Sequence, residues 1–306
     1  MTSAAYARFA AFRKSQPRTP RLERTIVQVR GLSLAVFRTP AVAGAPPLCC
    51  VNGGMIFSHS LLWPALAPLA HTRQLILFDL RGRGESQTPP APRASRVEFD
   101  AGDVVALRTA LGLAQWDLFG HSWGGGIAML AAAGDLGGVR RLVLASAVGP
   151  TSAWVASLHQ NALDNLEGAE GATLAALDPA ALHQDDPEVH AVYSRALYPA
   201  YFADHELARM FAPPRALSAT GAAVAAQLRR DGYDWRAAVR TIRAPTLLLH
   251  GLNDVLPATL ADETTALIPD ARRHPIADAG HMPFWEQPAE FFGAVESFLS
   301  PAAATA

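Results

Sequence analysis

The chain has 306 residues, of which 50% are hydrophobic, and a formal net charge of −1. These totals predict one large domain, or one domain with an insertion, around a sizeable buried core. They argue against a nucleic-acid-binding protein and against a polybasic membrane-surface protein, and no apolar run approaches the length of a membrane span.

The N-terminal stretch Met1–Pro20 is polar and contains arginine, without the apolar core of a signal peptide. We expect residues 1–24 to form a surface lead-in that is partly helical from Ala4 to Lys14. The two cysteines, Cys49 and Cys50, are adjacent within an apolar run. Because adjacent cysteines rarely bridge, we expect buried free thiols and a cytoplasmic location.

Strand-like and helix-like segments alternate from residue 25 to residue 148. Strands are expected at Thr25–Val29 and Leu32–Arg38, which form a hairpin, and at Leu48–Val51, Gln74–Phe78, Leu113–Phe119 and Val139–Ala145. Helices are expected at Ser60–Leu69, Val97–Leu111 and Ile127–Ala133. This alternation predicts an α/β fold with a mostly parallel central sheet flanked by helices on both faces.

The pattern changes after Gly149, where strand signals vanish and an Ala-rich helical stretch continues to about Trp235. Breaks occur at Asp178-Pro179, Asp186-Pro187 and Pro213-Pro214. We interpret residues 149–239 as a helical cap inserted into a core formed by residues 25–148 and 240–306. The core resumes with strands at Pro245–His250 and Arg272–Pro275 and helices at Pro257–Leu267 and Pro288–Leu299.

The stretch Gly120-His121-Ser122-Trp123-Gly124 fits G-x-S-x-G, a turn that joins a strand to a helix and exposes its serine. Residues two positions from the serine must be small because the turn is sharp. The helix directs its positive N-terminal end at the serine oxygen, and the Trp123 amide is free to bind an oxyanion. We therefore predict that Ser122 is a nucleophile rather than part of an ordinary glycine turn.

A second glycine pair, in Asn52-Gly53-Gly54, follows the short strand expected at Leu48–Val51. Glycines at the end of a buried strand let the backbone approach another group closely. Functional groups of parallel sheets lie beyond the carboxyl ends of the strands, where Ser122 also falls. The alternative is an ordinary loop, but we predict that the Gly54 amide is a second oxyanion donor.

A serine nucleophile needs a base and a carboxylate that orients the base. Of the ten histidines, we choose His281 because it lies in a glycine-flanked loop after the last predicted strand. Asp254 follows a strand in Gly251-Leu252-Asn253-Asp254 and is our candidate acid, with Asp278 as a distant second choice. The chain order of serine, aspartate and histidine is the one expected for this arrangement of strands.

These motifs resemble those of the α/β-hydrolase superfamily from Thr25 to Leu299. The motifs are Asn52-Gly53-Gly54, Asp79-x-Arg81-Gly82-x-Gly84-x-Ser86, Gly120-His121-Ser122-Trp123-Gly124-Gly125, Gly251-x-x-Asp254 and Gly280-His281. Within the superfamily, Gly53 to Ala70 and Tyr201-Phe202-Ala203-Asp204 are similar to proline iminopeptidase-like members. The resemblance implies the α/β-hydrolase fold, with Ser122 as nucleophile, Asp254 as acid, His281 as base, and the Gly54 and Trp123 amides as the oxyanion hole.

We expect a serine hydrolase without metal or cofactor that acts through an acyl-enzyme on a small ester, lactone or amide. Its substrate pocket is expected to include Met55, Phe57, Trp154 and Tyr201. Two substrate classes stay open, a small ester or lactone and an N-terminal amino-acid amide, and the second predicts cap carboxylates that bind an ammonium group. The non-enzymatic alternative is a ligand-binding protein on the same fold. The sequence leaves the oligomeric state open.

Overall fold

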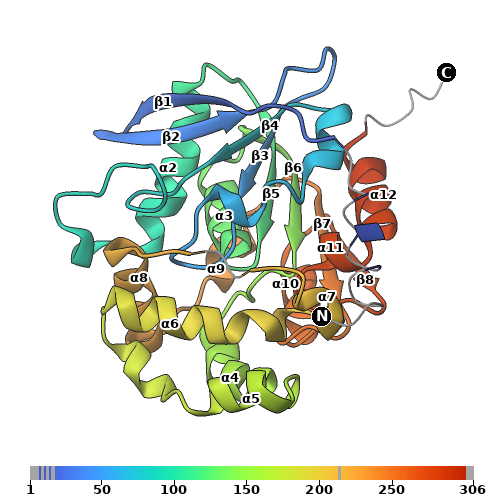
Figure 1. The fold of residues 1–306 in the computed structure, drawn as a ribbon. Coiled ribbons are helices and arrows are strands. Elements are labelled where there is room, and N and C mark those ends of the chain that lie inside the picture. The colour runs from blue at the N-terminus through green and yellow to red at the C-terminus, as the bar shows by residue number, and fades with distance from the viewer. Residues whose placement is uncertain (1–6, 8–9, 12–13, 15–17, 213–214, 301–306) are drawn as a thin grey trace.

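An eight-stranded β-sheet forms the centre of the computed structural model, which describes residues 18–212 and 215–300 together with positions 7, 10, 11 and 14 (Figure 1). Its strands are β1 (Glu23–Val29), β2 (Leu32–Arg38), β3 (Leu48–Val51), β4 (Leu75–Phe78), β5 (Trp116–His121), β6 (Val139–Ala145), β7 (Thr246–Gly251) and β8 (Ala271–Ile276). Their order across the sheet is β1-β2-β4-β3-β5-β6-β7-β8. Strand β2 is antiparallel to both of its neighbours, and the other adjacent pairs are parallel, which confirms the expected mostly parallel sheet.

The central strands are buried because their sequences are almost entirely apolar. Every residue of β3, β4 and β7 is buried. Successive side chains point to opposite faces, so that on β5 Leu118 packs into one core and Phe119 into the other. Continuous apolar strands are typical of a parallel sheet that is covered on both sides. Cys49 and Cys50 lie in β3 as buried free thiols, as expected.

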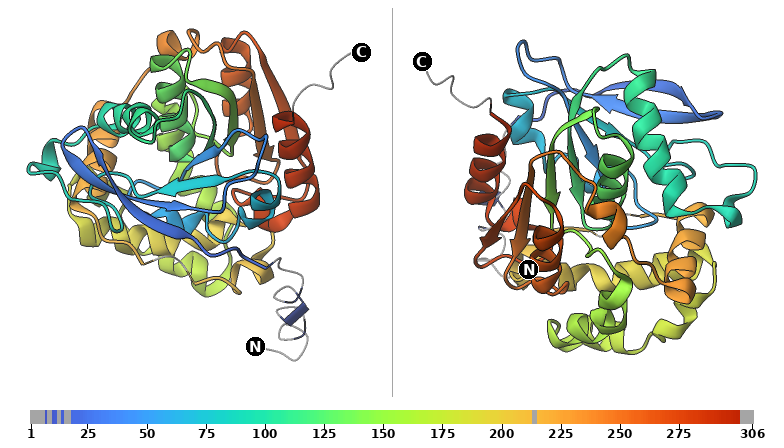
Figure 2. Two further views of the ribbon diagram at one scale, coloured as in Figure 1. Left: turned by 90° about the horizontal axis from the view of Figure 1, so that it is seen from above. Right: turned by 180° about the vertical axis from the view of Figure 1, so that it is seen from behind.

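Helices cover both faces of the sheet (Figure 2). The core that contains Leu118 is closed by α2 (Val97–Ala110), α3 (Trp123–Gly134) and α10 (Thr259–Leu267). The core that contains Phe119 is closed by the 3₁₀ turns η1 (His59–Leu61) and η2 (Ala67–His71), by α11 (Pro283–Glu286) and by α12 (Pro288–Leu299). The layered arrangement expected from the sequence is therefore present.

The chain between β6 and β7, which we call the helical insertion, contains no named strand among its described residues. Its α-helices are α4 (Val155–Asp164), α5 (Gly168–Ala175), α6 (Pro187–Leu197), α7 (His205–Ala208), α8 (Ala219–Asp231) and α9 (Arg236–Val239). Figure 1 shows them gathered below the carboxyl ends of the parallel strands. The helical character expected from Gly149 to Trp235 is thus observed, whereas the division into a cap at 149–239 and a core stays a prediction.

The helix predicted at Ser60–Leu69 is wrong. The segment forms the two short 3₁₀ turns η1 and η2, which are separated by a non-helical turn. Pro64 and Pro68 lie inside it, and each lacks the N–H group that an α-helix requires. The segment still buries apolar side chains, including Leu62, Leu66 and Leu69. Their spacing is typical of an amphipathic helix, which is why the sequence indicated one.

Two predicted boundaries differ from the observed ones by several residues. Strand β5 begins at Trp116 rather than at Leu113, because the Arg108 side chain binds the carbonyl oxygens of Leu113 at 2.7 Å and Ala114 at 2.8 Å and holds them in a loop. Helix α3 begins directly after Ser122 rather than at Ile127. Most of the helix expected at Ala4–Lys14 lies outside the described residues, as does the Pro213-Pro214 break.

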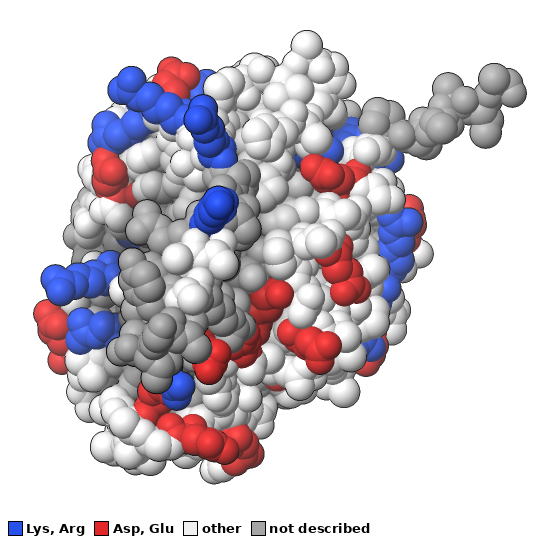
Figure 3. Space-filling view, turned by 45° about the vertical axis from the view of Figure 1, so that its right-hand side comes forward, with Lys and Arg blue, Asp and Glu red and all other residues white. Residues whose placement is uncertain are grey.

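The surface carries charges of both signs. On the face in Figure 3, basic and acidic side chains are interspersed with uncharged ones, and no continuous basic surface is visible among the coloured residues. No helix in the described part of the chain is both long and apolar enough to cross a membrane.

Candidate active site

Ser122 lies at the sharp turn between β5 and α3. Its φ of 54° and ψ of −122° form a conformation that residues other than glycine rarely adopt. A Cβ atom on Gly120 would lie 2.5 Å from the Gly124 carbonyl oxygen, and a Cβ atom on Gly124 would lie 2.3 Å from the Val51 carbonyl oxygen. Neither glycine of G-x-S-x-G could therefore be replaced by a residue with a side chain, because there is no space for a Cβ atom around the turn.

Backbone hydrogen bonds fix this turn against the neighbouring chain. The Ser122 N–H group donates to the Ala145 carbonyl at 3.0 Å, and the Ser122 carbonyl accepts from the Gly125 N–H group at 2.9 Å. Trp123 is the first residue of α3, so its N–H group is one of those that a helix leaves without an intrahelical partner. A backbone donor and the positive end of the helix dipole therefore lie next to Ser122.

The loop that follows β3 passes close to the Ser122 turn. A Cβ atom on Gly53 would lie 2.8 Å from the Ser122 Cβ atom. Gly54 has a φ of +67°, and a Cβ atom there would lie 2.1 Å from the Phe57 ring. The Asn52 side-chain amide holds the loop by donating to the carbonyl oxygens of Gly53 at 3.1 Å and Phe57 at 3.2 Å. Gly54 lines the same cavity as Ser122.

His281 and Asp254 form a buried hydrogen-bonded pair. The His281 Nδ1 atom lies 2.9 Å from each carboxylate oxygen of Asp254. One of these oxygens also accepts the Leu256 N–H group at 2.9 Å. Burial alone would raise the pKa of Asp254, but attraction to His281 and the hydrogen bond between them outweigh it and lower that pKa. Asp254 is therefore an anion that accepts the proton on Nδ1.

This pairing leaves the Nε2 atom of His281 free to accept a proton, which is what a general base requires. His281 and Ser122 line one cavity. No hydrogen bond joins the Ser122 hydroxyl to the His281 ring among the described residues. Such contacts are often loose in proteins without substrate and tighten when substrate binds.

The loop that carries His281 is attached to the helical insertion. The His281 N–H group donates to the Tyr201 carbonyl at 2.7 Å, and the two aromatic rings lie 4.6 Å apart. The Glu286 carboxylate accepts the N–H groups of Gly280 and Ala203, both at 2.7 Å, and that of Asp204 at 3.0 Å. Burial raises the pKa of Glu286 to about 7, against the effect of these donors. Glu286 therefore ties the insertion to the His281 loop.

The competing acid and bases lie in different environments. Asp278 is exposed, and its backbone carbonyl, not its carboxylate, accepts a hydrogen bond from Gln287 at 3.2 Å. His250 is buried, and its Nε2 atom lies 2.9 Å from the Leu256 carbonyl oxygen. His121 is buried with its Nε2 atom 2.9 Å from the His281 carbonyl oxygen, so it supports the His281 loop instead of facing the cavity.

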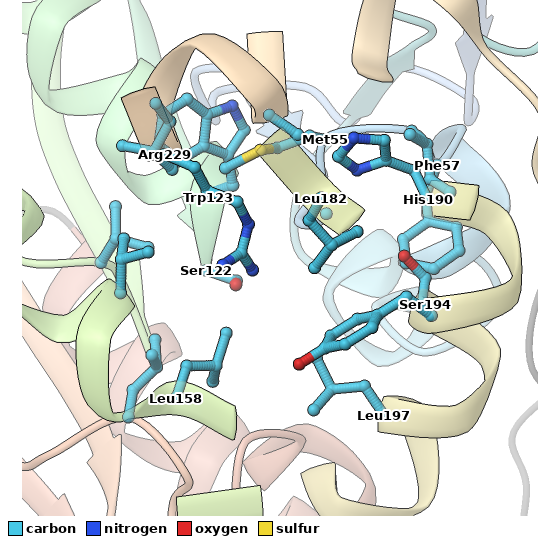
Figure 4. Close-up of a pocket in the computed structure, with 18 of the residues that line it drawn as sticks. Met55, Phe57, Ser122, Trp123, Leu158, Leu182, His190, Ser194, Leu197 and Arg229 are labelled. Atoms are coloured by element: carbon cyan, nitrogen blue, oxygen red, sulfur yellow. The ribbon is translucent and has the colours of Figure 1, made fainter. Parts of the chain in front are cut away.

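A cavity of about 100 Å³ lies between the Ser122 turn and the helical insertion (Figure 4). The four residues expected to form a substrate pocket, Met55, Phe57, Trp154 and Tyr201, line it. Helices α4, α6 and α8 add residues that the pocket predicted from the sequence did not include, which are Val155, Leu158, His190, Tyr193, Ser194, Leu197, Ala225, Leu228 and Arg229. The cavity is smaller than the ~150 Å³ that holds a benzene molecule, so the group that enters it is short.

The charges around the cavity differ from those expected of an ammonium site. Among the described residues that line it there is no aspartate or glutamate, whereas the Arg229 side chain is one of them. Figure 4 shows the Arg229 guanidinium projecting into the space in front of Ser122. One signal could have revealed this residue: Ala225, Leu228 and Arg229 stand at positions i, i+3 and i+4 of a helix and therefore share one face.

The charged loop after β4 supports the site from behind. Asp79 accepts the N–H groups of His59 and Glu85, each at 2.8 Å. Arg83 is fully buried, pairs with Asp100 at 2.9 Å, and donates to the Met55 carbonyl at 2.9 Å. The Asp79 to Ser86 motif thus holds the loop that contains Gly54. In the described part of the chain, no cluster of three or more histidine, cysteine or acidic side chains could hold a metal ion.

Comparison with known proteins gives a consistent result. A sequence model of the alpha/beta hydrolase fold matches residues 46–288. The 2-hydroxymuconate semialdehyde hydrolase of Pseudomonas sp. (strain CF600) is 30% identical over 270 residues, which cover 86% of this chain and 90% of that protein. A proline iminopeptidase of Lactobacillus delbrueckii subsp. bulgaricus is 25% identical over 267 residues, covering 80% and 86%. The solved proline iminopeptidase of Mycobacterium smegmatis has a TM-score of 0.72 at 20% identity, covering 90% and 97%, and shares the fold.

Proposed function

The chain belongs to the alpha/beta hydrolase fold family and is a hydrolase, and on that premise we propose that it cleaves small esters with Ser122, His281 and Asp254 as a catalytic triad. The observation that carries the proposal is the composition of one cavity. Ser122, His281 and Gly54 line it together, and most of its other lining side chains are apolar. An ester with short apolar parts fits such a wall better than a charged peptide does.

In the proposed first half-reaction, the His281 Nε2 atom takes the Ser122 proton while Oγ attacks the ester carbonyl carbon. The carbonyl oxygen becomes an oxyanion, which accepts hydrogen bonds from the Gly54 and Trp123 N–H groups. Loss of one such donor typically costs about 10²–10³ in rate. The intermediate collapses when the alcohol leaves with the proton from His281, and Ser122 is left acylated.

The second half-reaction uses water in place of the serine hydroxyl. His281 removes a proton from water as the water oxygen attacks the acyl carbon. Collapse of the second intermediate breaks the bond to Ser122 Oγ, which regains its proton from His281. Asp254 holds the imidazole with its proton on Nδ1 and stabilises the imidazolium in both steps. The products are a carboxylic acid and an alcohol.

An aminopeptidase of the proline iminopeptidase type is the alternative that the sequence left open. That activity requires a negative group to receive the ammonium of the substrate. The described lining of the cavity includes a guanidinium and no carboxylate, so it favours an uncharged or anionic substrate. We therefore rank the aminopeptidase below the esterase.

The test is a panel of substrates given to the purified full-length protein. p-Nitrophenyl acetate and butyrate report ester cleavage, and proline and alanine p-nitroanilides report aminopeptidase activity. 2-Hydroxymuconate semialdehyde, named as the substrate of one group of relatives, reports cleavage of a carbon–carbon bond. We expect ester hydrolysis that Ser122→Ala abolishes, together with labelling of Ser122 by a fluorophosphonate.

The panel can overturn the proposal in two ways. Cleavage of the anilides alone, abolished in Ser122→Ala, would make the protein an aminopeptidase. Ester hydrolysis that persists in Ser122→Ala, with a fluorophosphonate adduct elsewhere or nowhere, would remove Ser122 as the nucleophile. Because Ser122 is at a turn with little space, the folded state of the variant is checked by its thermal unfolding.

A further inference from the structure

The Arg229 side chain lies in the wall of an apolar cavity, and its guanidinium group has no acidic partner there. It lies on the inner face of α8 and is only partly exposed. Among the described residues, no carboxylate lies within 4 Å of its nitrogens, and none of its N–H groups makes a hydrogen bond. This differs from the three arginines that are buried in the described part of the chain, Arg73, Arg81 and Arg83, each of which bonds to an aspartate.

The unpaired state of Arg229 costs free energy, since removal of a charge from water is unfavourable unless an opposite charge replaces the water. Burial accordingly lowers the pKa of Arg229. The titratable groups that interact with it in the cavity wall are Tyr193, Tyr201 and His190, and none of them carries a full negative charge at neutral pH. An anion that enters the cavity would supply the missing partner.

The helix that carries Arg229 is fixed on two loops, the charged loop after β4 and the loop that bears Gly54. The Ser218 hydroxyl donates to the Gly82 carbonyl at 2.6 Å and accepts the Gly221 N–H group at 2.9 Å at the start of α8. Gly221 packs so closely that a Cβ atom there would lie 2.3 Å from the Met55 carbonyl oxygen. Arg229 therefore projects from a rigid element, and its position relative to Ser122 is defined.

We propose that Arg229 binds a carboxylate of the substrate, so that the cavity accepts a short ester that carries a second, ionised carboxyl group. This inference rests on the proposed ester hydrolysis at Ser122. A planar guanidinium matches a carboxylate, which it can bind through two parallel hydrogen bonds. Arg229 is the one arginine among the described lining residues, and its single charge matches a carboxylate better than a phosphate group, which carries nearly two negative charges.

Two esters of the same shape test the proposal. Monomethyl glutarate ends in a carboxylate, and methyl 5-methylhexanoate ends in an uncharged branched group of the same size. The quantity measured is the ratio of their kcat/KM values, with methanol release as the assay. We expect Arg229→Gln to lower this ratio about 10- to 100-fold, which is the effect of losing a charge-assisted hydrogen bond, and Arg229→Lys to lower it less.

Arg230 offers the matched control on the same helix. It is exposed and donates to the His183 carbonyl at 2.8 Å, away from the cavity lining. Arg230→Gln changes the net charge by the same amount as Arg229→Gln, and we expect it to leave the ratio as in the unmodified protein. For this pair of esters, an equal ratio in Arg229→Gln and the unmodified protein would show that a carboxylate on the acyl side gains nothing from Arg229.

A second pair of esters identifies the half of the substrate that is charged. 3-Acetoxypropanoate has its carboxylate on the alcohol side, and 3-methylbutyl acetate is the uncharged ester of the same shape. If Arg229→Gln lowers the ratio for this pair instead of the first, the anion belongs to the leaving alcohol. If Arg229→Gln changes neither ratio, the proposal is overturned.

A binding measurement separates this inference from the proposed ester hydrolysis. Glutarate is titrated into the protein while the fluorescence of the cavity tryptophans, Trp123 and Trp154, is recorded. Binding that weakens at least 10-fold in Arg229→Gln, without cleavage of any ester, would retain the carboxylate site and reject the esterase. Ester cleavage that depends on Ser122, with equal glutarate binding in Arg229→Gln and the unmodified protein, would retain the esterase and reject the carboxylate site.

Discussion

The backbone N–H group of His281 donates a 2.7 Å hydrogen bond to the Tyr201 carbonyl, and the rings of the two residues lie 4.6 Å apart. His281 is in the loop before α11, whereas Tyr201 is in the helical insertion about 80 residues earlier. The proposed base is thus held from two sides, by Asp254 through its ring and by the insertion through its backbone.

Shortening Tyr201 is predicted to impair the position of His281. Tyr201→Ala removes the ring that packs on the imidazole, and misplacement of a catalytic group by about 1 Å can cost about 10² in rate. Tyr201→Phe keeps the ring, so its loss of catalytic rate should be much smaller. The measurement is kcat on p-nitrophenyl butyrate, and equal losses in the two variants would show that the hydroxyl, not the ring, matters.

Asp254→Asn is predicted to lower kcat about 10⁴-fold with little change in the fold. The amide keeps the shape of the side chain but can donate to Nδ1, which moves the imidazole proton to Nε2 and removes the base. Stopped-flow assays on p-nitrophenyl esters would measure the effect. A loss below about 10-fold would mean that another group orients His281.

Gly124→Ala is predicted to destabilise the Ser122 turn and abolish activity, because its Cβ atom would lie 2.3 Å from a backbone oxygen. Gly134 is the matched control at the other end of α3, where a Cβ atom meets nothing within 4 Å. Gly134→Ala should raise the free energy of unfolding by about 0.5 kcal/mol. Urea unfolding and ester hydrolysis check both variants, and similar behaviour of the two would contradict the steric argument.

Arg83→Met is predicted to lower the free energy of unfolding by about 3–5 kcal/mol, because it leaves the Asp100 carboxylate buried without its partner. The double variant Arg83→Met/Asp100→Leu removes both charges and should recover part of the loss. Urea unfolding measures both variants. A double variant as unstable as the single one would show that the bond from Arg83 to the Met55 carbonyl carries the effect instead.

His121 is predicted to make the fold sensitive to acid. Burial, followed by repulsion from His281, lowers the pKa of His121 from 6.5 to about 3. Between these values the unfolded chain binds more protons than the folded chain, so the free energy of unfolding falls as the pH falls. Between pH 7 and pH 5, we expect His121 to lower the free energy of unfolding by about 2 kcal/mol.

His121→Gln tests this sensitivity, since glutamine keeps a donor for the His281 carbonyl but does not titrate. The free energy of unfolding is measured in urea at pH 7 and pH 5 for both proteins. The difference between the two pH values should be about 2 kcal/mol smaller in the variant. An identical difference would mean that the folded chain protonates His121 as easily as the unfolded chain does.

The sequence predicted the sheet well because parallel strands such as β3 and β7 are short apolar runs, which fit few structures other than a buried strand. It also predicted the turn at Ser122, since only small residues fit at Gly120 and Gly124. The helix predicted at Ser60–Leu69 is wrong because Pro64 and Pro68 interrupt a segment whose apolar residues have helical spacing. These successes and the failure depend on local chemistry, which is what a sequence displays directly.

The sequence could not predict features that depend on distant contacts. Whether Arg229 has a partner is decided by where α8 lies relative to the acidic residues of the insertion. The bond between Tyr201 and His281 likewise depends on tertiary packing. The proposed substrate preference therefore rests on the side chains that α4, α6 and α8 place around one cavity.

The contact between α8 and the Gly54 loop has a consequence for transplanting helical insertions between relatives. Ser218 binds Gly82, and Gly221 leaves no room for a side chain against Met55. A chimera that brings a larger residue to position 221 would push the proposed oxyanion donor away from Ser122. New specificities are therefore more readily reached by single replacements along the inner face of α8 than by exchange of the whole segment.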